Sequence, residues 1–196
     1  MVRSQKLFFV LIFFISVAMS ACFAFIFNHP LIGDAVGYDD LGWNLAQGRG
    51  FSLDSSQPYT PTMYREPTYP LFLSGIFYIF GHNLTAVRLI QIFIFALSSI
   101  MLFYLAQKIF DKKTAMISCF IFSIFPTAAN YPSYLLTETL FTLLLIATIL
   151  ILLKAILCKY IYLFFCAGIL LGITILCKAV MLLFFIPVIL VLYFKF

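Results

Sequence analysis

The run LFFVLIFFISVAMSACFAFIF, from Leu7 to Phe27, contains no charged residue and decides the fold class. As a helix that rises about 1.5 Å per residue, it extends about 31 Å, enough for the hydrocarbon core of a bilayer. An alternative interpretation is a signal peptide, because Met19-Ser20-Ala21-Cys22 weakly resembles a lipoprotein cleavage site. The apolar run continues past this stretch, which favours a retained transmembrane helix.

Apolar residues dominate the rest of the chain as well. Hydrophobic residues make up 64% of the 196 residues and charged residues 10%, whereas soluble domains carry roughly 25% charged residues. We therefore predict an all-α polytopic transmembrane helical bundle that forms a single domain over residues 1–196. Pro126 and Pro187 should bend the spans that contain them. The predicted spans cover about residues 7–27, 85–107, 114–130, 135–153, 160–177 and 179–194.

The one substantially polar region is residues 28–66, which hold five of the seven acidic residues. Within it, Asp39 to Gln47 has the length of a short helix that ends at Gly48. The following segment, residues 67–80, is apolar but too short for a comfortable span, which is typical of an interfacial or re-entrant segment. The first loop therefore carries short juxtamembrane helices.

The positions of the basic residues predict the orientation of the chain. Cytoplasmic loops carry an excess of Lys and Arg, so we place the N-terminus in the cytoplasm and the first loop outside. Because the basic residues are scattered and not clustered on one face, the net charge of +5 does not indicate nucleic-acid binding. Eight basic residues then lie inside (Arg3, Lys6, Lys108, Lys112, Lys113, Lys154, Lys159 and Lys195) and four lie near the outer face (Arg49, Arg65, Arg88 and Lys178).

Three charged residues are candidates for chemistry. Asp34 follows the first span, where a carboxylate can act as a general base on a hydroxyl; a solvated loop aspartate or a helix cap is the alternative. Arg65 suits a lipid phosphate, although an interfacial anchor explains it equally well. Glu138 lies in a span, where ionisable residues are costly and indicate function. Arg88 and Lys178 are similar cases at the outer ends of spans, with mutual pairing or interfacial contact as the alternative.

No metal site or cofactor is predicted. His29 and His82 are isolated in the sequence, and a metal site needs several ligands with supporting groups. The cysteines lie in or beside apolar runs without a CxxC pair, which is typical of small packing residues.

Several motifs, taken in order, resemble one family. The segments Asp34-Ala-Val-Gly-Tyr38, Leu45-Ala-Gln-Gly-Arg-Gly-Phe51, Arg65-Glu-Pro-Thr-Tyr69-Pro70, Ala86-Val-Arg88-Leu and Ala167-Gly-Ile-Leu-Leu-Gly172 are similar to C-type (GT-C) membrane glycosyltransferases. The closest group contains dolichyl-phosphate-mannose protein mannosyltransferases and bacterial aminoarabinose transferases. The resemblance runs from about residue 30 to 190.

This resemblance implies transfer of a sugar from a polyprenyl-phosphate carrier to a lipid, glycan or protein acceptor at the extracytoplasmic face of the plasma (inner) membrane. It implies Asp34 as the catalytic residue. Many relatives have an acidic pair at this motif, whereas Ala35 follows Asp34, so Asp39 or Asp40 takes that place or the acceptor differs. The expected substrate-binding residues are Tyr38, Asp39, Asp40, Arg65, Glu66, Tyr69 and Glu138.

Relatives of this kind are usually more than twice as long, with more spans and often a C-terminal outer domain. We therefore expect the chain to correspond to an N-terminal portion of such an enzyme. Two alternatives are a transporter or flippase subunit and a non-catalytic membrane partner. Transporters have polar residues near the bilayer midplane and internal repeats, whereas here the polar residues cluster at one face and no repeat is visible.

Overall fold

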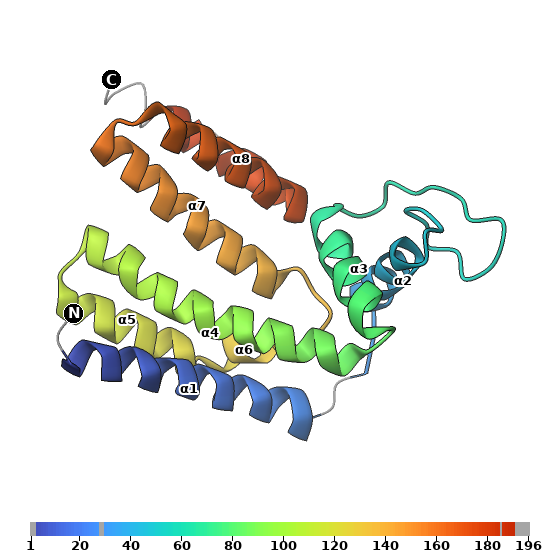
Figure 1. Ribbon diagram of the computed structural model, residues 1–196, viewed down its shortest axis with the longest axis horizontal. Coiled ribbons are helices and arrows are strands. Elements are labelled where there is room, and N and C mark those ends of the chain that lie inside the picture. The colour runs from blue at the N-terminus through green and yellow to red at the C-terminus, as the bar shows by residue number, and fades with distance from the viewer. Residues whose placement is uncertain (1–2, 28–29, 185, 191–196) are drawn as a thin grey trace.

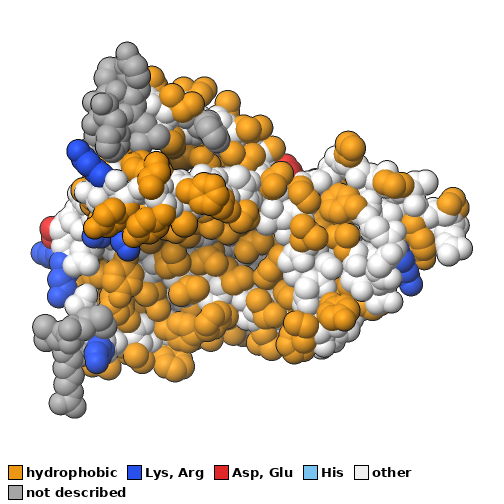
Figure 2. Space-filling view, turned by 45° about the horizontal axis from the view of Figure 1, so that its top comes forward, with side chains coloured by type: hydrophobic (Ala, Val, Ile, Leu, Met, Phe, Trp, Pro, Cys, Tyr) orange, Lys and Arg blue, Asp and Glu red, His pale blue; other side chains and the backbone are white. Residues whose placement is uncertain are grey.

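The computed structural model describes residues 3–27, 30–184 and 186–190, and within these ranges it contains helices and no strand. The predicted all-α class is therefore confirmed. Three helices are long and apolar enough to cross a membrane, namely α1 (Arg3–Ile26), α4 (Leu84–Ile109) and α7 (Glu138–Cys158). Their outward side chains are largely apolar, and Figure 2 shows apolar side chains over most of the bundle. The chain is a multi-pass membrane protein.

A fourth apolar stretch is bent. Helix α5 (Lys112–Ile124) is followed by α6 (Pro126–Asn130) and the 3₁₀ turn η1 (Tyr131–Ser133), and the two parts meet at 52°. Pro126 lacks the N–H that would continue α5, so a new helix begins there. The kink predicted at Pro126 is confirmed.

Helix α4 lies at the centre of the bundle (Figure 1), where it packs against α1, α5 and α7. Small polar residues allow a close approach of α1: the Ser16 hydroxyl donates to Ser99 Oγ at 3.0 Å, and Ser20 donates to the Ala129 carbonyl at 2.8 Å. Such interhelical hydrogen bonds stabilise helix packing where water is absent. Helix α8 (Ile161–Cys177) packs on α7 at the side of the bundle.

Two short helices cap one end of the bundle (Figure 1): α2 (Asp34–Ala46) and α3 (Thr68–Phe80). They pack closely at Gly42, where an added Cβ would lie 2.7 Å from the Leu73 Cβ. Trp43 and Phe77 make an edge contact beside this point, with ring centroids 6.1 Å apart. A glycine at the crossing therefore lets α2 lie against α3.

Several helix boundaries differ from the predicted ones. Helix α2 begins at Asp34, not at Asp39, because Gly33 with a φ of 57° turns the chain directly into it. Residues 135–137 lie outside α7, which begins at Glu138.

The C-terminal segment is described only in part. Residues 179–184 form the 3₁₀ helix η2 (Ala179–Phe184), and residues 186–190 are helical. The remainder of the predicted span 179–194, together with Lys195, lies outside the described residues. The six predicted spans stay a prediction.

The described basic residues form two groups at opposite ends of the bundle. Lys108 lies in the last turn of α4, Lys112 begins α5, and Lys159 links α7 to α8; these helix ends lie at the same end of the bundle as the start of α1. Figure 2 shows blue side chains gathered at this end. Arg65 and Lys178 lie at the other end, beside α2 and α3. In chain order α2 and α3 lie between α1 and α4, and both stay at the end of the bundle that carries Arg65 and Lys178.

We predict that Gly42→Ala lowers the free energy of unfolding by about 1–3 kcal/mol, because the new methyl group overpacks the contact with Leu73. Gly75→Ala is the matched control, since an added Cβ at Gly75 in α3 meets no atom within 4 Å. Denaturant unfolding in detergent, followed by tryptophan fluorescence of Trp43, measures both variants. Equal stability of the two would contradict the close packing of α2 on α3.

Candidate active site

The first element of the site is an ion pair between Asp34 and Arg65, with 2.5 Å between Oδ1 and Nη2. Asp34 is the first residue of α2, where a carboxylate interacts favourably with the helix dipole. The Arg65 guanidinium also lies over the rings of Tyr38 and Tyr64, at 5.3 and 4.7 Å from their centroids. The Arg65 side chain is 18% exposed and that of Asp34 59% exposed, so the carboxylate is the more accessible partner.

Tyr38 forms the wall behind this pair. Its ring packs edge-on against Tyr69, with centroids 5.1 Å apart. Burial raises the pKa of Tyr38 to about 12, although the nearby Arg65 cation opposes the shift. The Tyr38 hydroxyl therefore stays protonated at neutral pH and can donate a hydrogen bond.

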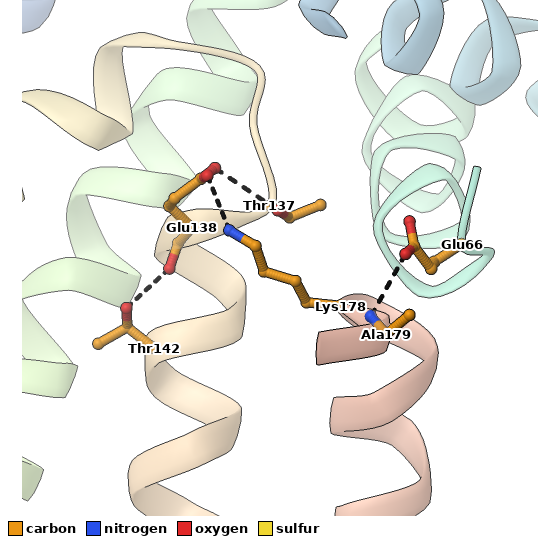
Figure 3. A network of polar contacts seen from close by, with 6 residues as sticks. All are labelled: Glu66, Thr137, Glu138, Thr142, Lys178 and Ala179. Atoms are coloured by element: carbon orange, nitrogen blue, oxygen red, sulfur yellow. Dashed lines mark hydrogen bonds and ion pairs between the residues drawn. The ribbon is translucent and has the colours of Figure 1, made fainter. Parts of the chain in front are cut away.

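The second element is an ion pair between Glu138 and Lys178, with 3.0 Å between Oε1 and Nζ (Figure 3). Glu138 is the first residue of α7, and Lys178 directly follows α8. The Thr142 hydroxyl donates to the Glu138 carbonyl at 2.8 Å. The backbone N–H of Ala179 donates to Glu66 Oε1 at 3.3 Å, which ties the segment before α3 to the end of α8.

The two ion pairs line one polar pocket of about 210 Å³. Its walls come from the start of α2, the segment before α3, the start of α7 and the end of α8. The Arg65 and Lys178 cations of the pocket can bind an anionic group of a polar ligand, and the carboxylates can accept hydrogen bonds from its hydroxyl groups. The lining residues are Asp34, Tyr38, Arg65, Glu66, Leu136, Thr137, Glu138, Cys177 and Lys178.

An apolar cavity of about 340 Å³ shares Glu138 with the polar pocket. Phenylalanine side chains of α4 and α5, at Phe95 and Phe122, form much of its wall together with Phe125. Thr139 also lines it, and its buried hydroxyl has no hydrogen-bond partner among the described residues. Glu138 therefore stands between a polar pocket and an apolar one.

The segment that leads into α7 is held by side chains of α4. Gln91 Nε2 donates to the carbonyls of Pro132 and Tyr134, at 3.0 and 2.8 Å. Arg88 Nε donates to the Ser133 carbonyl at 3.2 Å. The Tyr69 hydroxyl donates to Gln91 Oε1 at 2.7 Å, so α3 joins the same network. These contacts fix the place where α7 begins, and with it Glu138.

Five of the residues predicted from the sequence line the polar pocket: Asp34, Tyr38, Arg65, Glu66 and Glu138. The other three lie elsewhere. Tyr69 is fully buried behind Tyr38, and both carboxylate oxygens of Asp39 contact His82 Nε2, at 2.8 and 3.0 Å. Asp40 does not line the pocket, and burial together with the nearby Asp39 carboxylate raises its pKa. Ligand contacts of all eight stay a prediction.

Sequence reasoning left four lining residues out of the site: Leu136, Thr137, Cys177 and Lys178. Lys178 had a visible signal, because a lysine at the outer end of one span needs a partner such as Glu138 at the outer end of another. Leu136, Thr137 and Cys177 carried no such signal. In the described part of the chain, no three His, Cys, Asp or Glu side chains gather closely enough to hold a metal ion. His29 lies outside that part.

The fold and the pocket define a multi-pass membrane protein with a polar, mixed-charge site at one end of its helical bundle. A sequence model of the dolichyl-phosphate-mannose-protein mannosyltransferase family matches residues 60–195, and the chain belongs to this family. It is thus a membrane glycosyltransferase of the mannosyltransferase type. Comparisons with curated proteins and with solved structures returned no match. The matched range includes Arg65, Glu138 and Lys178, and it begins after Asp34.

We predict that Gln91→Leu destabilises the protein by about 1–3 kcal/mol or more, because it leaves buried carbonyls of the segment before α7 without donors. Gln107→Leu on the exposed side of α4 is the control and should leave the stability nearly unchanged. Thermal unfolding in detergent compares the two variants. A Gln91→Leu protein as stable as wild type would show that these hydrogen bonds do not hold the segment.

Proposed function

We propose that the protein transfers a sugar from a polyprenyl-phosphate carrier to an acceptor at the extracytoplasmic face of the plasma membrane. The observation that carries this proposal is the ion pair of Asp34 with Arg65 in one pocket, because a carboxylate can act as a general base and a guanidinium can bind phosphate. The family match supports the glycosyltransferase chemistry.

Arg65 and Lys178 are the proposed contacts of the carrier phosphate. Arg65 presents a planar guanidinium suited to two parallel hydrogen bonds with phosphate oxygens. Its Nε is buried and has no hydrogen-bond partner among the described residues. Lys178, directly after α8, adds a second cation to the pocket.

Asp34 is the proposed catalytic residue. Its carboxylate takes the proton from the acceptor hydroxyl as the hydroxyl oxygen forms a bond to the anomeric carbon. The bond from that carbon to the phosphate oxygen breaks, and its electron pair stays on the phosphate. Arg65 and Lys178 stabilise this developing charge, which is the kind of electrostatic contribution that dominates in many enzymes. Tyr38 supplies a protonated hydroxyl beside the phosphate.

The apolar cavity beside Glu138 is the proposed place for the first part of the polyprenyl chain. A chain attached to a phosphate in the polar pocket must leave it toward apolar surroundings. The cavity shares Glu138 with that pocket and is lined by Phe95, Phe122 and Phe125. Aromatic and aliphatic walls of this kind bury hydrocarbon favourably.

The distribution of basic residues supports the proposed orientation. The end of the bundle with Lys108, Lys112 and Lys159 carries the excess of positive charge expected on the cytoplasmic side. The pocket lies at the opposite end, next to α2 and α3. The acceptor is therefore proposed to reach Asp34 from outside the cell.

Asp34→Asn is expected to lower sugar transfer about a hundredfold or more, because the amide cannot accept the acceptor proton. The measurement is transfer of a labelled sugar from its polyprenyl phosphate by the purified protein. Asp111→Asn is the matched control: it removes the same charge from the N-cap of α5, at the other end of the bundle, and Asn also caps helices well. Full transfer activity in a folded Asp34→Asn protein excludes the catalytic role.

Ala128→Trp is expected to raise the KM for a long-chain carrier about tenfold, because the indole fills the apolar cavity that Ala128 lines and displaces contacts made by the chain. The KM for a geranyl-length carrier should rise by a similar factor, because the geranyl group is the part of the chain that the cavity is proposed to hold. Ile124→Trp, at an exposed position of α5 outside the cavity, is the control. An unchanged KM for both carriers in the Ala128→Trp protein would place the chain elsewhere.

A further inference from the structure

The charges that line the polar pocket do not balance. Three carboxylates, those of Asp34, Glu66 and Glu138, face two cations, Arg65 and Lys178. Each cation already has a carboxylate partner, at 2.5 Å for Arg65 and 3.0 Å for Lys178. Among the described ion pairs none involves Glu66, whose oxygen accepts only the Ala179 N–H at 3.3 Å. At formal charge, the pocket therefore holds one negative charge in excess.

This excess matters for a ligand that is itself an anion. A carrier loaded with sugar is a phosphodiester with one negative charge. After the sugar leaves, the carrier is a phosphomonoester, which carries about −1.5 to −2 charges at neutral pH because its second pKa is near 6. Both forms present two non-bridging oxygens to Arg65 and Lys178, and the monoester has a third, which the departing sugar leaves on the phosphate. They differ in the additional charge, which the carboxylates of the pocket repel.

We propose that Glu66 makes the pocket select the phosphodiester over the phosphomonoester, so that the spent carrier is released after transfer. This inference rests on the proposed function, since it concerns the carrier phosphate in the same pocket. Glu66 is the residue assigned to this selection because its charge is not neutralised by a cation, unlike those of Asp34 and Glu138. Repulsion by one unit charge in a partly buried site corresponds to about tenfold weaker binding.

Glu66→Gln separates the charge of this residue from its structural contact. The glutamine oxygen can still accept the Ala179 N–H, so the link between the segment before α3 and the end of α8 is kept. The negative charge is removed, and the pocket then holds equal numbers of acidic and basic side chains. Glu66→Asp keeps the charge on a shorter side chain. It tests whether the charge or the shape of the side chain determines the preference for the phosphodiester.

The experiment measures the Kd of two probes for the purified full chain in detergent, at neutral pH and with a chelator present. The probes are geranyl phosphate, a monoester, and its methyl diester. Wild type should bind the diester about tenfold more tightly than the monoester. In Glu66→Gln the ratio should approach one, mainly through tighter binding of the monoester. Glu66→Asp and the remote control Asp111→Asn should keep the wild-type ratio.

The possible outcomes separate this inference from the proposed function. Two results overturn the selection by Glu66: equal affinity of wild type for both probes, or a ratio of the two Kd values that Glu66→Gln leaves unchanged. Neither result contradicts the proposed binding site for the carrier phosphate. A ratio that collapses equally in Asp111→Asn assigns the effect to net charge and also overturns it. If wild type binds neither probe, the phosphate site fails, and the proposed function fails with it.

Discussion

The hydrogen bonds from α4 to the non-helical segment before α7 are the contacts on which the site depends. Inside a membrane protein, backbone groups that leave a helix need partners from the protein itself, because lipid supplies none. Gln91 and Arg88 satisfy the carbonyls of Pro132, Ser133 and Tyr134 in this segment. Because the segment is held in this way, α7 begins at Glu138 and its first carboxylate faces the pocket.

The pocket combines short pieces of chain that are far apart in the sequence. Asp34 and Arg65 are 31 residues apart, and Glu138 and Lys178 are 40 residues apart. Each pair joins one acidic and one basic residue, and the two residues come from different elements of the fold. An anionic ligand therefore has to compete with the carboxylates for both cations, and the affinity of the pocket depends on the charge of the ligand as well as on its shape.

Helices α2 and α3 decide on which side of the bundle the site opens. Both follow α1 and precede α4 in the chain and lie at one end of the bundle, and Gly42 allows them to pack closely against each other. The buried Tyr69 of α3 connects them to Gln91, so the caps and the bundle form one unit around Tyr38. This arrangement puts Asp34 and Arg65 beside the ends of α7 and α8, opposite the group of basic residues at the start of α1.

The sequence by itself determined the all-α class, the bend at Pro126 and the polar end of the molecule. Each of these follows from local properties: the length of apolar runs, the missing N–H of proline and the clustering of acidic residues in one loop. Five of the eight predicted site residues share one pocket, because they lie close to the ends of helices that meet there. Only the tertiary structure decided that Lys178 pairs with Glu138, that Asp39 contacts His82 instead of lining the pocket, and that Glu66 lacks a cation among the described ion pairs. Those outcomes depend on how the ends of separate helices are placed relative to one another, and the periodicity of a single segment carries no information about that placement.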